Sequence, residues 1–425
     1  MASRYADTLP RLAVPPPRVR FLPAGWPIYG LFLGFPLWWA VGIGAFILPI
    51  MALPMAAWLF RQRTVLAPRG FGIWVAFLLW TLGSATQLDD PNKYVQFGYT
   101  FSLYAAATIV LLYVLNVPRE ALPTRRVIMT IVVFWAFVVI WGILAVLFPT
   151  VSFSTPVEAI TPEALLENEF VYRLVHPSLA QVHDILGYSQ PRPNAPFAYA
   201  TNWAAAFALL TPFVILGWRM SRTSMSRLLI VALFLTAVVP VVASLGRGLW
   251  LSLSAGLIYA ALRSAIAGRG RTLLTVLLAI AAMLTVIYLT PLKTIVTDRF
   301  ANPHSNPVRL SLYQEATERI VESPIFGFGS PQPARFNPNA PPVGTQGQLW
   351  QVLVSHGVPG ALLFVSWFLY QFWRSRAVST DVTLWCHTVV LIALIQLPFY
   401  DSIGIALAVI MMAIAVMNRE TLVPR

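Results

Sequence analysis

About twelve apolar segments, each long enough to form a membrane-spanning helix, occupy more than half of the sequence. A helix needs about 20 mostly apolar residues to cross the ~30 Å hydrocarbon core of a bilayer. The sequence therefore predicts an all-α integral membrane protein with about 12 transmembrane helices. We expect these spans at residues 22–40, 42–60, 70–87, 97–117, 127–148, 196–217, 228–245, 247–265, 272–290, 347–373, 382–399 and 402–418.

The composition excludes an ordinary soluble enzyme. Hydrophobic residues make up 58% of the chain, charged residues make up 11%, and the mean hydropathy is +0.70. A soluble domain has roughly 45–50% apolar and about 25% charged residues. The single cysteine, Cys386, lies in an apolar segment and excludes an intrachain disulfide or a cysteine-based metal site.

The distribution of charge predicts the orientation in the membrane. With the N-terminus inside, the inner segments carry 20 basic and four acidic residues, whereas the outer segments carry nine basic and 12 acidic residues. This asymmetry follows the positive-inside rule and explains the net charge of +13 without nucleic-acid binding. We expect a multi-pass protein of the cell membrane with both termini in the cytoplasm and an uncleaved first span.

Two long outer loops divide the predicted spans into three groups. The sequence shows no internal repeat and no broken helix in corresponding positions of two halves. The expected order is a cytoplasmic arm (1–21), spans 1–5 (22–148), an outer loop (149–195), spans 6–9 (196–290), a larger outer loop (291–346), spans 10–12 (347–418) and a cytoplasmic tail with the remnant of a tag (419–425).

The first outer loop carries two helix signals. Thr161–Pro162 fits a helix N-cap followed by a proline at the first helical position. Ser178–Gln181 fits a capping box that would begin a second short helix.

The larger outer loop contains a stronger helix signal. We expect a helix from Asn306 to about Ser323, where Pro324 follows. On this helix Arg309 and Tyr313 share one face, while Glu315 and Arg319 are spaced to form an ion pair.

Arg247 is the most informative charged residue. It lies in Ser244–Gly248, between two apolar spans that leave almost no loop to hold it in water. An arginine at this depth usually faces a polar cavity and serves a function. The alternative is an arginine whose head extends to the outer headgroups.

Arg309 and Arg192 are the next candidates. Arg309 occupies the first turn of the outer helix, where an anion is already favoured, and its guanidinium suits phosphate. Arg192 precedes the sixth span, where Asn194 and Asn202 supply polar groups. Arg309 alone could be a solvated charge, and Arg192 an interfacial anchor. Three arginines together, without a matching acidic cluster, predict a site for a diphosphate.

A metal centre is poorly supported. Asp89–Asp90 is more simply a solvated loop, and no histidine or carboxylate cluster has the spacing of metal ligands. His304, which we expect in the outer compartment, could act as a general base.

Four segments together resemble the O-antigen ligase and O-antigen polymerase superfamily. Ser244–Gly248 is similar to its Ser-Arg-Gly element, and Arg192–Asn202 resembles its arginine-proline entrance. Arg309–Gly329 resembles the family segment in which an arginine, an aromatic residue, a proline and a Gly-x-Gly motif follow one another. Leu349–Gly360 resembles the family helix that ends in Gly-Leu-Pro-Gly. Each motif is short, and their order carries the resemblance.

The resemblance implies a GT-C-like membrane glycosyltransferase. Its members transfer a glycan from undecaprenyl diphosphate or another polyprenyl-diphosphate carrier to an acceptor hydroxyl on a glycan or glycolipid, outside the membrane. Arg247, Arg309 and Arg192 would bind the diphosphate, and no metal or cofactor would be required. Asn194, Asn202 and Tyr313, which lie in or beside the same motifs, would contact substrate.

One position departs from the family pattern. The family histidine, near the start of span 10, corresponds to about Gln346. A glutamine can hydrogen-bond an acceptor but cannot take its proton. Three explanations stay open: the base is His304, Glu315 or Glu158; the diphosphate leaves without a base; or the acceptor differs from the lipid A core that the family's ligases use.

Two other functions remain open at this stage. A flippase or exporter of lipid-linked sugars would also hold a diphosphate with arginines, but would commonly show repeated halves and broken helices. A scaffold subunit would leave Arg247 unexplained. The sequence does not separate a ligase from a polymerase.

Overall fold

The computed structural model describes residues 23–183, 186–301, 306–336, 340–377 and 380–421. It is mostly helical, with one two-stranded hairpin. Within these residues, seven helices are long and apolar enough to cross a membrane. The chain is therefore a multi-pass membrane protein, while its twelve-span layout stays a prediction. The N-terminal arm, His304 and the tag remnant lie outside the described residues.

The first five predicted spans coincide with helices. The span expected at 22–40 is interrupted at Gly34, where the indole N–H of Trp38 donates to the carbonyl of Gly30 at 2.8 Å. The helices are α1 (Trp26–Leu33) with α2 (Phe35–Val41), α3 (Ile47–Phe60), α4 (Phe71–Ser84) with the 3₁₀ turn η1 (Ala85–Gln87), α5 (Pro91–Asn116) and α6 (Thr124–Leu147).

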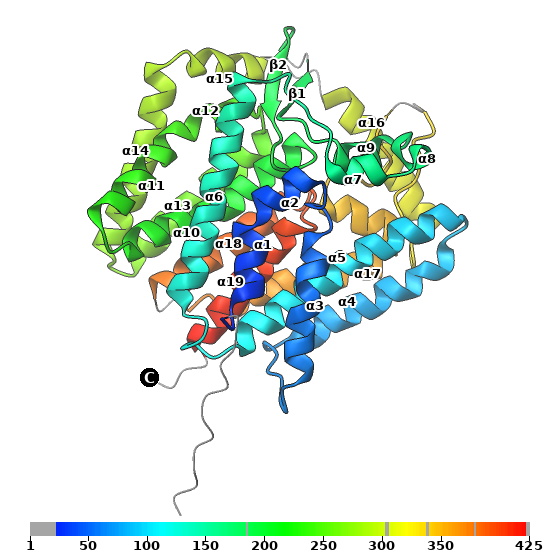
Figure 1. The fold of residues 1–425 in the computed structure, drawn as a ribbon, viewed down its shortest axis with the longest axis horizontal. Coiled ribbons are helices and arrows are strands. Elements are labelled where there is room, and N and C mark those ends of the chain that lie inside the picture. The colour runs from blue at the N-terminus through cyan, green and yellow to red at the C-terminus, as the bar shows by residue number, and fades with distance from the viewer. Residues whose placement is uncertain (1–22, 184–185, 302–305, 337–339, 378–379, 422–425) are drawn as a thin grey trace, which may run out of the picture.

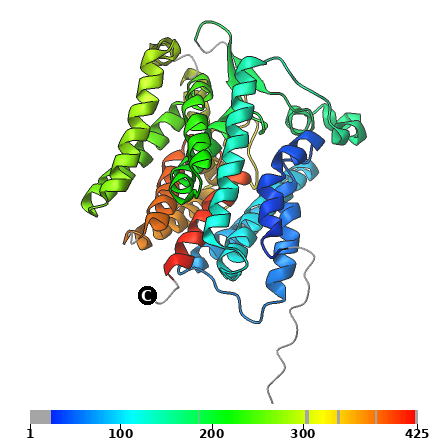
Figure 2. The same ribbon diagram turned by 60° about the vertical axis from the view of Figure 1, so that its left-hand side comes forward.

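The other seven predicted spans also coincide with helices. These are α10 (Ala200–Met220), α11 (Ser224–Thr236) with α12 (Val238–Ala243), α13 (Arg247–Ile266), α14 (Gly270–Leu289), α17 (Gln348–Arg374), α18 (Asp381–Gln396) and α19 (Ile405–Thr421). Helices α10 and α19 form the centre of the bundle, because nearly all their side chains are buried. By contrast α14 lies at the edge (Figure 2) and exposes most of its apolar surface, as expected for a helix that faces lipid.

The first outer loop folds differently from the prediction. It contains α7 (Pro156–Ile160), α8 (Glu163–Leu166) and α9 (Glu169–Val175). The capping residue is Thr155, which forms a capping box with Glu158, and not Thr161, which ends α7. The expected N-cap at Thr161 is therefore wrong, although a helix does begin just after Pro162.

The second helix expected in this loop is also wrong. Residues Ala180–His183 form strand β1, which pairs antiparallel with β2 (Gln190–Pro193). The carbonyl of Ser178 accepts from the side-chain amide of Asn194 at 3.2 Å, and the carbonyl of Leu179 accepts from the backbone N–H of Asn194 at 3.1 Å. Pairing with a later segment thus satisfies backbone groups that the sequence pattern assigned to a helix.

The helix predicted in the larger outer loop is confirmed as α16 (Asn306–Glu322), which follows α15 (Leu292–Ala301). The predicted ion pair on it also forms, with 3.8 Å between Arg319 Nη2 and Glu315 Oε1. In Figure 1, β1, β2, α15 and α16 lie toward the same end of the helix bundle.

Helix α17 is broken at Gly357, which has φ 70° and ψ −177°. The backbone N–H of Val358 donates instead to the carbonyl of Pro324 at 2.8 Å, and the N–H of Gly329 donates to the carbonyl of Ser355 at 2.8 Å. A side chain at position 357 would collide with the carbonyl of Ile325. The loop after α16 therefore packs into the break, and the expectation of no broken helix is wrong for α17.

Candidate functional site

The turn between α12 and α13 places Arg247 at the first position of α13. Ser244 accepts from the backbone N–H of Gly246 through its hydroxyl at 3.2 Å, and Leu245 adopts a positive φ of 52°. This turn reverses the chain within three residues, so Arg247 begins α13 directly and is half-buried.

Tyr400, between α18 and α19, fits against both glycines that flank Arg247. A Cβ at Gly246 would lie 2.8 Å from the Tyr400 hydroxyl, and a Cβ at Gly248 would lie 2.9 Å from its ring. The hydroxyl accepts from the backbone N–H of Leu249 at 2.9 Å. The glycines of this motif therefore admit a tyrosine from a distant segment, a reason that the sequence pattern did not show.

Two arginines bind the carbonyls of the same turn. The Nε–H of Arg192, on β2, donates to the carbonyl of Ser244 at 2.8 Å. The Nε–H of Arg299, on α15, donates to the carbonyl of Leu245 at 3.3 Å. Both carbonyls lie just after the end of α12. The last carbonyls of a helix have no hydrogen-bond donor within the helix, so they need donors from elsewhere. Each bond uses one of the five N–H donors that a guanidinium carries.

The structure brings the three predicted arginines into one electrostatic group with Arg299. The pKa of Arg192 is lowered to about 10, chiefly by burial; the charge of Tyr400 opposes this shift, and the charges of Arg309 and Arg299 add to it. Burial also lowers the pKa of Arg299, followed by the charges of Arg247 and Arg309. We call Arg192, Arg247, Arg299 and Arg309 the arginine cluster.

Tyr400 lies within the field of the arginine cluster. Burial raises the pKa of its hydroxyl, while the hydrogen bond from Leu249 and then the charges of Arg192, Arg309 and Arg247 lower it. The positive charges around one buried tyrosine come from β2, α13 and α16, three segments far apart in the sequence.

The sequence analysis did not single out Arg299 or Tyr400. Arg299 is only 4% exposed. Its outer loop carries five of the nine outer basic residues, so no local signal distinguishes it. Tyr400 has no local signal either, because its role depends on a contact 151 positions away in the chain.

The three predicted substrate-contacting residues lie in different settings. Asn194 is 2% exposed; its amide donates to Ser178 and Phe197, while its Oδ1 has no hydrogen-bond partner. Asn202 is half-buried in the first turn of α10. The ring of Tyr313 stacks on Trp350, with 4.8 Å between the ring centroids.

Two predicted catalytic groups form contacts within the outer loops. Glu315 is 2% exposed, and its carboxylate accepts from the backbone N–H of Arg335 at 2.8 Å as well as pairing with Arg319. Gln346 accepts from the backbone N–H of Gly344 at 3.0 Å and donates to the carbonyl of Pro342 at 2.9 Å. Both side chains therefore hold the loop that leads into α17.

Glu158 and His176 form a pair in the first outer loop, with 3.0 Å between Oε2 and Nδ1. The carboxylate of Glu158 also accepts from the backbone N–H of Thr155 at 3.3 Å, as part of the capping box. Glu158 therefore helps to hold α7 and α9 together.

Asp401 is a carboxylate that the sequence analysis did not single out. It follows Tyr400 directly and is half-buried, and its Oδ1 accepts from the backbone N–H of Ile403 at 3.1 Å. Burial raises its pKa to about 6, against the effect of this hydrogen bond. Gln348 fixes the segment, because its backbone N–H donates to the carbonyl of Tyr400 at 2.9 Å and its Oε1 accepts from the N–H of Ser402 at 3.1 Å.

The described residues contain no group of three or more histidine, cysteine, aspartate or glutamate side chains that could hold a metal ion. Asp89 pairs with Lys93 at 2.7 Å, and Asp90 caps α5.

Residues 231–365 match the family model of the O-antigen ligases. Over this segment, about a third of its length, the chain is similar to the O-antigen ligases. The predicted resemblance to this superfamily is thereby confirmed. The matched segment contains Arg247, Arg299 and Arg309, whereas Arg192, Tyr400 and Asp401 lie outside it. A comparison with curated proteins found no match.

Proposed function

We propose that this protein transfers a glycan from a polyprenyl-diphosphate carrier to an acceptor hydroxyl on the outer side of the membrane. The observation that carries the proposal is the arginine cluster. Four guanidinium groups on β2, α13, α15 and α16 make up this cluster, and their charges are among the causes that shift the pKa values of Arg192, Arg299 and Tyr400. Gathering like charges is unfavourable unless an anion of high charge occupies the site.

The diphosphate is the anion that fits both this charge and the membrane. Arginine binds phosphate oxygens with two parallel hydrogen bonds, which position the group as well as neutralise it. Arg247 begins an apolar helix, so a diphosphate bound there would have its lipid tail beside the bundle and its sugar toward the outer loops.

In the proposed reaction, the acceptor oxygen attacks the anomeric carbon of the donor sugar. The bond between that carbon and the diphosphate oxygen breaks, and its electron pair moves onto the diphosphate. Fixed guanidinium groups stabilise this charge where it develops. The acceptor proton must go to a base.

We assign the base to Asp401. Glu315, Glu158 and Gln346 are engaged in holding the outer loops, as described above. Asp401 directly follows Tyr400 in the sequence, and the hydroxyl of Tyr400 is within the field of the arginine cluster. With a pKa of about 6 it is ionised at neutral pH, yet basic enough to accept a proton.

The proposal is tested with the full-length protein in lipid nanodiscs. A polyprenyl-diphosphate-linked glycan serves as donor, and both the new glycan and the released lipid diphosphate are measured. We expect Arg247→Ala or Arg309→Ala to reduce transfer by about 10²–10³-fold, as for other groups that stabilise a developing anion. Arg173→Ala is the matched control, since Arg173 is an outer-loop arginine paired with Glu169.

Unchanged turnover in both cluster variants would refute the site. Loss of turnover in the Arg173 variant to the same degree would show a general effect of outer charge. Movement of donor across the bilayer without a new glycosidic bond would instead identify a flippase. EDTA should leave transfer intact, and a requirement for added metal would contradict the mechanism.

A further inference from the structure

A second basic site lies at the opposite end of the helices that carry the arginine cluster. Helix α10 begins after β2, which holds Arg192, and ends at Met220, one residue past Arg219. Helix α13 begins at Arg247 and ends just before Gly268. Each helix has 20 or 21 residues and spans about 30 Å at 1.5 Å per residue.

This second site is a pocket of about 430 Å³. Its walls come from the end of α10, the turn between α13 and α14, and the start of α18. We call it the basic pocket, and its lining residues are Arg219, Gly268, Arg269, Gly270, Arg271, Thr272, Thr380 and Asp381.

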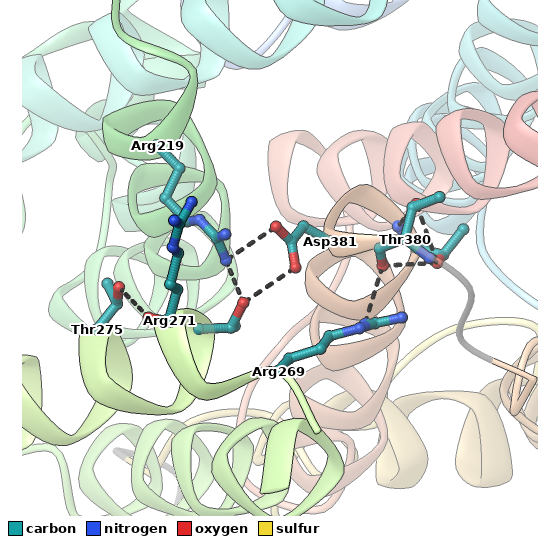
Figure 3. A network of polar contacts seen from close by, with 8 residues as sticks. Arg219, Arg269, Arg271, Thr275, Thr380 and Asp381 are labelled. Carbon is teal, nitrogen blue, oxygen red and sulfur yellow. Dashed lines mark hydrogen bonds and ion pairs between the residues drawn. The ribbon is translucent and has the colours of Figure 1, made fainter. Parts of the chain in front are cut away.

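One ion pair fixes the back of the basic pocket. Arg219 Nη1 lies 2.8 Å from Asp381 Oδ2, and the hydroxyl of Thr272 donates to Asp381 Oδ1 at 3.1 Å. Arg219 also donates to that hydroxyl. Figure 3 shows the side chains of Arg219 and Asp381 directed toward each other. The charge of Asp381 is thus balanced by Arg219.

Arg269 and Arg271 supply the remaining charge. Arg269 extends toward α18 (Figure 3) and donates to the carbonyl of Thr380 at 3.4 Å, while Arg271 is an exposed residue that also lines the basic pocket. The basic pocket therefore has three guanidinium groups and one carboxylate, an excess of two positive charges. This excess matches a phosphate group, which carries one or two negative charges.

An apolar surface on α14 lies beside Arg271. Arg271, Leu274 and Leu278 are at i, i+3 and i+7 and so share one face of this helix, and Leu274, Leu277 and Leu278 are 57%, 49% and 60% exposed. They belong to a candidate membrane span of which only 11% is buried in the protein. A ligand with a phosphate head and acyl chains would contact the arginines and these leucines together, whereas free phosphate would contact the arginines alone.

We propose that the basic pocket binds the phosphate group of an anionic lipid headgroup, with the acyl chains of that lipid against α14. The site is separate from the arginine cluster, since the two lie at opposite ends of α10 and α13. It therefore does not depend on the proposed transferase activity.

The test measures lipid binding to the full-length protein in nanodiscs. Phosphatidylglycerol is titrated against a phosphatidylcholine background, with native mass spectrometry as the readout. A guanidinium that donates hydrogen bonds to a phosphate holds it more strongly than a charge elsewhere on the membrane surface, and this variant removes two such groups from the basic pocket. We expect the double variant Arg269→Ala, Arg271→Ala to bind phosphatidylglycerol about 10- to 30-fold more weakly.

The matched control is the double variant Arg61→Ala, Arg63→Ala, which removes two exposed arginines just after α3. It should bind phosphatidylglycerol like the parent. Thermal unfolding in phosphatidylcholine alone shows whether each variant is folded, and Arg219 and Asp381 are left intact to preserve the ion pair.

Three outcomes would overturn the proposal. The first is equal binding of phosphatidylglycerol by the parent and the Arg269, Arg271 variant. The second is equal weakening in the Arg61, Arg63 control, which would show a general effect of surface charge. The third is displacement of phosphatidylglycerol by millimolar inorganic phosphate, which would identify a site for the free anion.

Discussion

The hydroxyl of Tyr400 accepts the backbone N–H of Leu249 at 2.9 Å. This bond joins the segment between α18 and α19 to the first turn of α13, two residues after Arg247. It fixes the orientation of the turn whose carbonyls bind Arg192 and Arg299. Tyr400 is therefore the contact through which distant parts of the chain hold the arginine cluster in place.

Tyr400→Phe should lower both stability and transfer. The variant leaves the buried N–H of Leu249 without its acceptor, which costs about 1–3 kcal/mol, and loosens the turn that begins with Arg247. We expect a lower midpoint of thermal unfolding together with reduced turnover. Tyr288→Phe, which changes an exposed tyrosine at the end of α14, should alter neither. A Tyr400→Phe protein of parental stability would show that this bond contributes nothing.

Arg299→Ala should weaken donor use although the sequence analysis did not propose this residue. It removes a buried charge from the arginine cluster and a donor to the carbonyl of Leu245. We expect kcat/KM for the donor to fall by about 10²-fold or more, with partial recovery in Arg299→Lys because the charge returns. Lys293→Ala on the same helix, at an exposed position, is the control. Parental donor kinetics in Arg299→Ala would remove Arg299 from the site.

Asp401 should produce a pH dependence near pH 6. Burial raises its pKa to about 6, so the carboxylate that accepts the proton is lost as the pH falls through this value. We expect transfer to decline below about pH 6, and Asp401→Asn to be much less active at every pH. Asp89→Asn, which changes an exposed carboxylate, should keep the parental profile. A parental pH profile in Asp401→Asn would show that another group is the base.

The same raised pKa predicts the sign of a stability effect. Ionisation of Asp401 is unfavourable in the folded protein compared with its ordinary value of 3.8. Its contribution to stability is present below about pH 4 and is lost as the pH rises through about 6. The parent should therefore become less stable than Asp401→Asn between these values, as measured by thermal unfolding. If the difference in unfolding temperature between the two proteins stayed constant across this pH range, the raised pKa of Asp401 would be contradicted.

Gln346→Ala should weaken acceptor use more than donor binding. Its amide holds Gly344 and Pro342 just before α17, where we expect the acceptor to bind. Thr345→Ala removes a neighbouring hydrogen bond to Pro342 and so reports the effect of loosening the loop alone. A rise in acceptor KM in the Gln346 variant beyond that in the Thr345 variant supports a direct contact. Equal values in the two would leave Gln346 as a residue that only shapes the loop.

Local sequence patterns were sufficient wherever the structure depends on neighbouring residues. Apolar segments form helices at the predicted places, because hydropathy and segment length are local properties. The helix from Asn306 and its pair between Glu315 and Arg319 follow from helical spacing. The order of short motifs was enough to predict the similarity to the O-antigen ligases found over residues 231–365.

Long-range contacts decided the rest. The segment at Ala180–His183 has a helix-start pattern, yet it forms a strand because β2 supplies its hydrogen-bond partners. Arg299 and Asp401 carried no local signal, since burial and electrostatic neighbours exist only after distant segments meet. The sequence therefore determined which segments form helices and which arginines lie beside apolar spans, where their charge is unfavourable. Tertiary packing decided which charges share a site. The reason is that desolvation and Coulomb interactions depend on distance in space and not along the chain.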